Sequence, residues 1–174
     1  MDALEFRNLY WNYYTQLEND FFSYSPYCEI DPCNDNAFSV KYLQLLLSVC
    51  GEIDSISKTF CKVLDNDFDP DTAGIDNYIS ILREEYPTFA TERVKILGYK
   101  YREVQPWKSI AYGNHVPSWW QDYNAIKHHR DQERNRKENY KYANQKNVLN
   151  ALCALYILIE YWVAKNFVAE KDIA

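Results

Sequence analysis

The chain has 174 residues, of which 47% are hydrophobic and 17% aromatic, with only 4 Gly and 6 Pro and a formal net charge of −6. This length suffices for one domain with its own core, and the scarcity of Gly and Pro favours helices over a turn-rich β fold. The acidic balance excludes a protein that coats nucleic acid with its whole surface, because such binding needs summed positive charge. We therefore expect a single helical domain over residues 1–174, which could still carry a local basic patch.

Apolar residues at three- and four-residue steps predict a first helix over 3–23. Its expected apolar face consists of Leu4, Phe6, Leu9, Tyr10, Tyr13, Tyr14, Leu17 and Phe21. Residues 1–36 carry seven carboxylates against Arg7 alone, so this helix either joins the bundle or covers a basic segment as a mimic of nucleic acid. The chain does not start with a basic segment followed by an apolar run, and we expect a cytoplasmic protein.

A long second helix is predicted over 37–65, with Asp35 or Asn36 as its N-cap. The side chains expected to face the core are Phe38, Leu45, Leu46, Val49, Ile53, Ile56, Phe60 and Val63.

The loop 65–74 alternates aspartates as the first ligands of an EF-hand do. However, Pro70 stands where that loop needs glycine, and Asp76 replaces the bidentate glutamate. We interpret the segment as a solvated loop in which Asp71 or Thr72 caps a short helix over 73–86.

Five cysteines, an odd number, indicate reduced thiols in this compartment. Cys50, Cys61 and Cys153 fall on apolar helix positions and are expected to be buried. Cys28 and Cys33 could pair or bind a metal, but no second close pair accompanies them, and we expect neither a metal nor a cofactor.

Residues 92–112 alternate apolar and polar side chains around Gly98, which predicts a small hairpin or extended insertion. Ser118 followed by Gln121 forms a capping-box pattern that should begin a further helix. We expect its charged continuation, 127–146, to run toward a final helix whose core stripe contains Val148, Leu149, Leu152, Leu155, Tyr156, Ile159 and Trp162.

The apolar run 148–164 is interrupted by Asn150 and Glu160 and is shorter than the roughly 20 residues of a membrane span. We therefore expect a central bundle helix and no membrane association. The assembled prediction is an all-α, up-and-down helical bundle of about five helices with a small extended or β-hairpin insertion near 92–112.

The segment 119–130 carries the candidate functional residues. On a helix, the ligand-binding candidates Trp120, Tyr123, Asn124 and Lys127 share one broad face, and His128 is the i+4 neighbour of Asn124. His128 could act as a general acid or base because histidine titrates near neutral pH.

Lys127, Arg130 and Arg134 could hold a phosphate. His128 and His129 diverge on a helix, which disfavours joint metal ligation, and His115 could reach the site from the preceding loop. Alternatively, the aromatic residues pack a core, and residues 130–138 form a solvated helix face.

The succession 38-FSVKYLQLLLSVCGEIDSISKTF-60, an extended insertion, 119-WWQDYNAIKHHR-130 and 143-ANQKNVLNALCALYILIEYW-162 resembles the HEPN superfamily over roughly residues 36–165. The resemblance implies a helical bundle that dimerises. Many members are metal-independent ribonucleases of bacterial toxin, phage-defence or RNA-processing systems.

The active motif of that superfamily is an arginine, often followed by a polar residue, with a histidine four to six residues beyond the arginine. His128 falls at the histidine and Asn124 at the polar residue, whereas Tyr123 stands where the arginine would be. The arginine would stabilise charge on the scissile phosphate, and tyrosine carries no charge for that role.

Three functions therefore compete. The first is a noncatalytic or regulatory module, homodimeric as the resemblance implies, that binds RNA, a nucleotide or a partner protein. Its binding surface would consist of Trp120, Asn124, Lys127, His128 and Arg130. The second is a metal-independent endoribonuclease with His128 as catalytic base and Lys127 or Arg130 as phosphate ligand. The third is a purely structural interaction protein in which Asn124 and His128 only satisfy buried polar groups.

Overall fold

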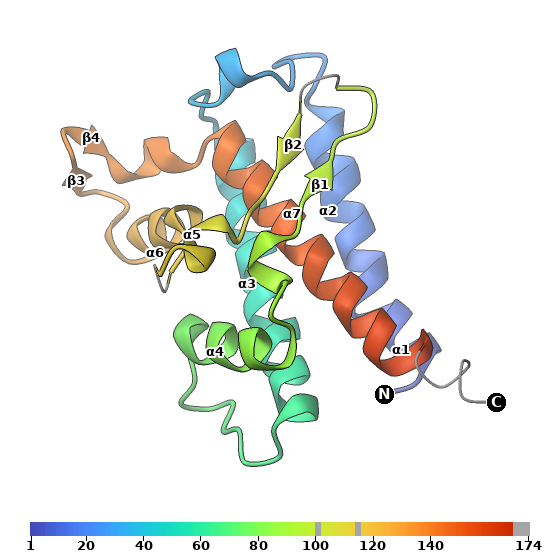
Figure 1. The fold of residues 1–174 in the computed structure, drawn as a ribbon. Helices are drawn as coiled ribbons and strands as arrows, with labels where there is room; N and C mark the ends of the chain where they lie inside the picture. Colours follow the sequence, from blue (N-terminus) through green and yellow to red (C-terminus); the bar gives the residue numbers. More distant parts are fainter. Residues whose placement is uncertain (100–101, 114–115, 169–174) are drawn as a thin grey trace.

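The computed structural model describes residues 1–99, 102–113 and 116–168, and its architecture is all-α (Figure 1). Three long helical segments form its centre. The first joins α1 (Ala3–Phe6), a π-helical turn (Arg7–Trp11) and α2 (Asn12–Ser23), and the other two are α3 (Val40–Leu64) and α7 (Gln145–Val163). The predicted fold class is confirmed.

Helices α2 and α3 are antiparallel, whereas α3 and α7 are parallel. Tyr10, in the first helical segment, lies 2.9 Å from the hydroxyl of Thr59 near the end of α3, so these two helices are antiparallel. Phe38 and Asn144 form an isolated β-bridge just before α3 and α7 begin. The two helices therefore start side by side, and because Phe60 and Trp162 near their ends are also in contact, they run in the same direction.

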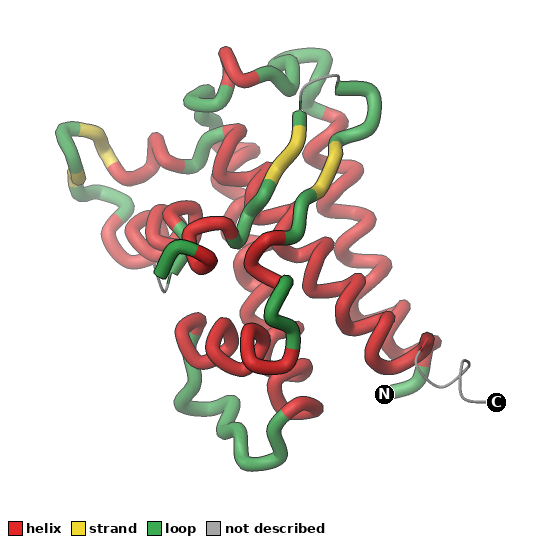
Figure 2. The backbone as a smooth tube through the Cα atoms, in the orientation of Figure 1, coloured by secondary structure: helices red, strands yellow, loops and turns green. Residues whose placement is uncertain are grey.

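Shorter elements cover this centre. They are α4 (Ile75–Glu85), β1 (Val94–Lys95), β2 (Glu103–Val104), α5 (Lys108–Ala111), α6 (Ser118–His129), β3 (Glu133–Arg134) and β4 (Lys137–Glu138). Strands β1 and β2 form the antiparallel hairpin predicted near 92–112, and β3 and β4 form a second antiparallel hairpin. Figure 2 shows these two hairpins on different parts of the molecule.

The core is centred on the contact between α3 and α7. Phe60 of α3 and Trp162 of α7 pack edge to face with ring centroids 5.4 Å apart. Cys50, Cys61 and Cys153 are buried, as predicted. Buried side chains lie on nearly all sides of α7, which explains its continuous apolar run. The segment 145–168 is long and apolar enough to cross a membrane, but most of it is buried inside the bundle.

A buried glutamine ties the loop after α2 to the start of α7. The Nε2 of Gln145 donates to the carbonyl oxygen of Glu29 at 2.9 Å and to the hydroxyl of Tyr42 at 3.2 Å, while its Oε1 accepts from the backbone N–H of Asp31 at 3.3 Å. These bonds satisfy an amide that is fully buried.

The predicted apolar faces of the first two helices were too broad. Leu4 and Leu9 are 64% and 59% exposed, and Tyr13 is also exposed. A helix on the surface of a bundle buries only one face, and the π-helical turn over Arg7–Trp11 changes which residues fall on that face. Phe38 precedes α3 and Val63 lies in its last turn, and both are exposed.

The expected caps of α3 and α4 were wrong. Ser39, and not Asp35 or Asn36, caps α3 by accepting from the backbone N–H of Tyr42. Helix α4 begins after Gly74, not at Asp71 or Thr72, and the side chain of Asn77 accepts from the Gly74 N–H. In the loop before α4, Asp65 and Asp69 instead accept from backbone N–H groups two residues on.

Helix α6 does begin at Ser118, but Pro117 is its N-cap, and Gln121 donates to the carbonyl oxygen of Val116 instead of closing a capping box. The expected helical continuation over 127–146 was wrong: α6 ends at His129, and the chain forms the β3–β4 hairpin and a 3-10 turn (Asn139–Tyr142) before α7.

The acidic first helix does not cover the basic segment. It packs on α3 and α7, whereas the β3–β4 hairpin projects from the opposite side of the molecule (Figure 1). The basic side chains of the hairpin are therefore not neutralised by this helix.

Candidate functional site

Two of the predicted ligand-binding residues belong to the core. The rings of Trp120 and Tyr123 lie 4.9 Å apart and both side chains are only 6% exposed. Burial, followed by the nearby Cys50 and Asp54, raises the pKa of Tyr123 to about 12. These two aromatic residues therefore pack in the core, as the alternative interpretation of the sequence predicted, and do not form an open ligand-binding surface.

The basic candidates lie at the other end of α6. Lys127, His128 and Arg130 are exposed at its C-terminal turn, where positive charge also complements the helix dipole. Asn124 is half-buried, and no hydrogen bond joins it to His128, although both belong to the described residues. His115 lies outside the described residues.

After α6 the chain makes a tight hairpin. Glu133 pairs with Glu138 and Arg134 with Lys137 across β3 and β4. The two turn residues, Asn135 and Arg136, have φ angles of 55° and 61°. Positive φ at both central residues defines a type I′ turn, whose backbone twist matches that of the two strands it connects.

Arg134 anchors this hairpin to the helices. Its guanidinium forms an ion pair with Asp122 of α6 and stacks on the ring of Tyr142 at 4.6 Å. The other carboxylate oxygen of Asp122 accepts from Nδ2 of Asn147 in α7 at 2.8 Å. Arg134, predicted to hold a phosphate, is thus engaged within the protein and acts by positioning its neighbours.

A second set of hydrogen bonds fixes the base of the hairpin. Nδ2 of Asn139 donates to the carbonyl oxygen of His129 at 2.7 Å, and the backbone N–H of Asn139 donates to Gln132 at 2.8 Å. The hydroxyl of Tyr142 donates to the carbonyl oxygen of Arg134 at 3.0 Å. The hairpin therefore has a defined orientation on the bundle.

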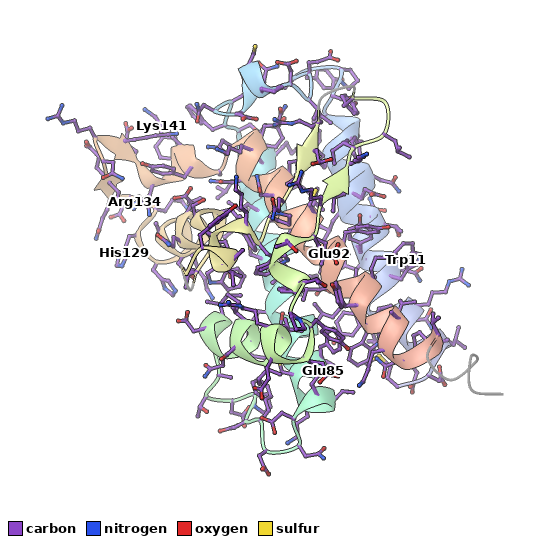
Figure 3. The ribbon with its side chains drawn as sticks, in the orientation of Figure 1. Trp11, Glu85, Glu92, His129, Arg134 and Lys141 are labelled. Carbon is purple, nitrogen blue, oxygen red and sulfur yellow. The ribbon has the colours of Figure 1, made fainter. Side chains whose placement is uncertain are left out.

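The surface formed by residues 127–141, which we call the basic hairpin face, carries six Lys or Arg residues and two histidines against three carboxylates. Figure 3 shows His129, Arg134 and Lys141 along one side of the molecule and Trp11 on the other. This local positive charge contrasts with the net charge of −6 of the whole chain.

Two exposed aromatic side chains lie at one end of the basic hairpin face: Tyr140, which belongs to it, and Phe38, which adjoins it. Phe38 and Tyr140 are 46% and 41% exposed, and their ring centroids lie 5.8 Å apart. The amine of Lys141 lies 5.9 Å from the centroid of the Phe38 ring and 5.7 Å from that of Tyr140. Aromatic and cationic groups thus stand together at the surface. Sequence reasoning missed this pair, because Phe38 was assigned to the core.

Comparison of the chain with protein-family models, with curated proteins and with solved structures gives no match. Among the residues that the structure describes, no group of three or more His, Cys, Asp or Glu side chains could hold a metal ion.

Proposed function

We propose that this protein is a noncatalytic RNA-binding module that holds single-stranded RNA on the basic hairpin face and the adjoining Phe38–Tyr140 pair. The observation that carries the proposal is the concentration of positive charge over 127–141 in an acidic protein, on a hairpin anchored by Arg134. Cationic side chains neutralise phosphates and release counterions, which drives binding.

The exposed aromatic pair favours single-stranded over double-stranded RNA. Unpaired bases can stack on the rings of Phe38 and Tyr140, each stacked base contributing roughly 1–3 kcal/mol. Lys141 beside them, which pairs with Glu138 at 2.7 Å, adds positive charge next to the backbone of a stacked strand. A duplex keeps its bases stacked inside and offers no ring faces to such a surface. The resemblance to HEPN proteins, many of which act on RNA, supports the same class of ligand.

The site supports binding better than cleavage. Tyr123 stands at the position of the catalytic arginine and is packed against Trp120 in the core. His128 is exposed and has no hydrogen bond to Asn124, whereas a general base works best when a neighbour orients it. One observation favours the endoribonuclease alternative. His128, in the last turn of α6, and Arg130, just after that helix, are both accessible to a substrate.

The test compares two double variants with the same change in net charge. Arg130→Ala with Arg136→Ala removes two cations from the basic hairpin face, and Arg7→Ala with Arg83→Ala removes two exposed cations elsewhere. Binding is measured by fluorescence anisotropy with a labelled 16-nucleotide RNA of mixed sequence. We expect about tenfold weaker binding for the first variant, because each phosphate contact contributes to affinity, and less than a twofold change for the second.

Equal losses in both double variants, or no saturable binding by the wild type, would contradict the proposal. The same samples, run on a denaturing gel without added metal, should contain intact RNA. Cleavage by the wild type that disappears in His128→Ala would replace the binding function with the endoribonuclease.

The resemblance also implies a homodimer, which stays a prediction. Light scattering of the purified protein gives its mass directly, and a value near twice the chain mass of 20.7 kDa is the expected result.

A further inference from the structure

A recess away from the basic hairpin face lies between α2, α7 and the β1–β2 hairpin. Its volume is about 470 Å³, within the usual range of roughly 300–1,000 Å³ for small-molecule sites. In Figure 1 the elements that border it lie on the side of the bundle away from β3 and β4.

Aromatic rings from three elements wall the recess. Tyr14 of α2 faces Tyr156 of α7 with centroids 5.9 Å apart, and Phe22 of α2 stacks on Tyr99 of the hairpin at 6.1 Å. Cys153 of α7 contributes to the apolar floor. Burial raises the pKa of this thiol to about 12, so it is neutral at physiological pH.

One carboxylate, that of Glu18, belongs to this aromatic wall. Its Oε1 accepts from the hydroxyl of Tyr14 at 2.8 Å, and no described residue donates to its Oε2. Burial and the adjacent Glu18 raise the pKa of Tyr14, which keeps the hydroxyl protonated and donating. Burial, Glu160 and Glu18 likewise raise the pKa of Tyr156, so neither tyrosine adds a charge at neutral pH.

Among the residues that the structure describes, no cation forms an ion pair with Glu18. Lys95 borders the recess, but its side chain is exposed, while its strand neighbour Val94 is half-buried, as expected when alternate residues of β1 face opposite sides. Arg102, whose charge acts on Cys153, is paired with Asp35. In the described part of the chain, the recess is therefore lined by aromatic rings and by one carboxylate, that of Glu18.

We propose that this recess binds a small organic cation, an ammonium group carried on an apolar body, with the ammonium against Glu18 and the body among the rings. Aromatic faces attract cations through their quadrupole, and more strongly where water is excluded. A carboxylate beside such rings selects for positive charge over neutral or anionic heads. This site is independent of the proposed RNA-binding function.

Three probes with the same body and different heads test the charge preference: 4-phenylbutylammonium, 4-phenylbutanol and 4-phenylbutyrate. Isothermal titration calorimetry of the full chain should show one bound 4-phenylbutylammonium per chain, with at least tenfold higher affinity than for the alcohol or the acid. In Glu18→Gln, which keeps an oxygen acceptor for Tyr14, the three probes should bind within about threefold of one another.

Asp20→Asn is the matched control, since it removes a carboxylate from the same helix at a residue that pairs with Gln16 and does not border the recess. It should retain the preference for the ammonium. Thermal unfolding of both variants verifies that they fold. The absence of saturable binding of the ammonium, equal affinity for the three heads, or an unchanged preference in Glu18→Gln would each overturn the proposal.

Discussion

Asp122 connects the basic hairpin face to the helices. Its two carboxylate oxygens join Arg134 of the hairpin to Asn147 of α7, so one side chain links three elements. The side chain of Asp122 is 16% exposed, and the ion pair is therefore only partly screened by water. The basic hairpin face needs this carboxylate for its orientation even though the carboxylate is negatively charged.

We expect Asp122→Ala to lower the free energy of unfolding by about 1–3 kcal/mol, because Arg134 loses its carboxylate partner and Asn147 keeps only the carbonyl oxygen of Tyr142 as an acceptor. Urea denaturation followed by circular dichroism measures the change. Glu85→Ala breaks the exposed pair with Lys165 and should cost less than about 1 kcal/mol. A similar small effect for Asp122→Ala would show that the anchor contributes little.

At the scale of single residues, the sequence predicts charge and accessibility only where the local pattern determines them. Exposure of Lys127 and Arg130 follows from their position beyond the last apolar residue of the helix, Ile126. The pairing of Arg134 with Asp122 could not be predicted, because it depends on where the chain leaves α6.

The β3–β4 hairpin is the element that sequence reasoning missed. The long helices follow from apolar periodicity over many residues, and their existence was predicted correctly. Each strand of this hairpin has two residues, both charged, so neither alternation nor β-propensity marks it. Asn135 was the available signal, because asparagine tolerates the positive φ that a two-residue turn requires.

Arg136 occupies a conformation that costs energy for a residue with a Cβ atom, since its φ is 61°. We expect Arg136→Gly to raise the free energy of unfolding by up to about 1 kcal/mol and to weaken RNA binding at the same time, because a charge is lost. Denaturation and anisotropy measured on one preparation separate the two effects. Lower stability of the variant would contradict the turn geometry described here.

At the scale of the whole molecule, the acidic first helix and the basic hairpin face lie on opposite sides (Figure 1). The acidic first helix packs against α3 and α7, and the basic hairpin face projects from the other side (Figure 1). The all-α class and the hairpin near 92–112 were predictable because they follow from composition and alternation. The parallel course of α3 and α7 was not, since nothing local encodes which way distant helices cross.

The measurement that tests the central claim most directly is the salt dependence of RNA binding by the wild-type protein. Single-strand binding by neutralisation of phosphates gives a slope of about −0.7 per contact in a plot of log K against log salt concentration. With three to five contacts from the basic hairpin face, we predict a slope between about −2 and −3.5. Binding that does not weaken with salt, or its absence at low salt, would contradict the account.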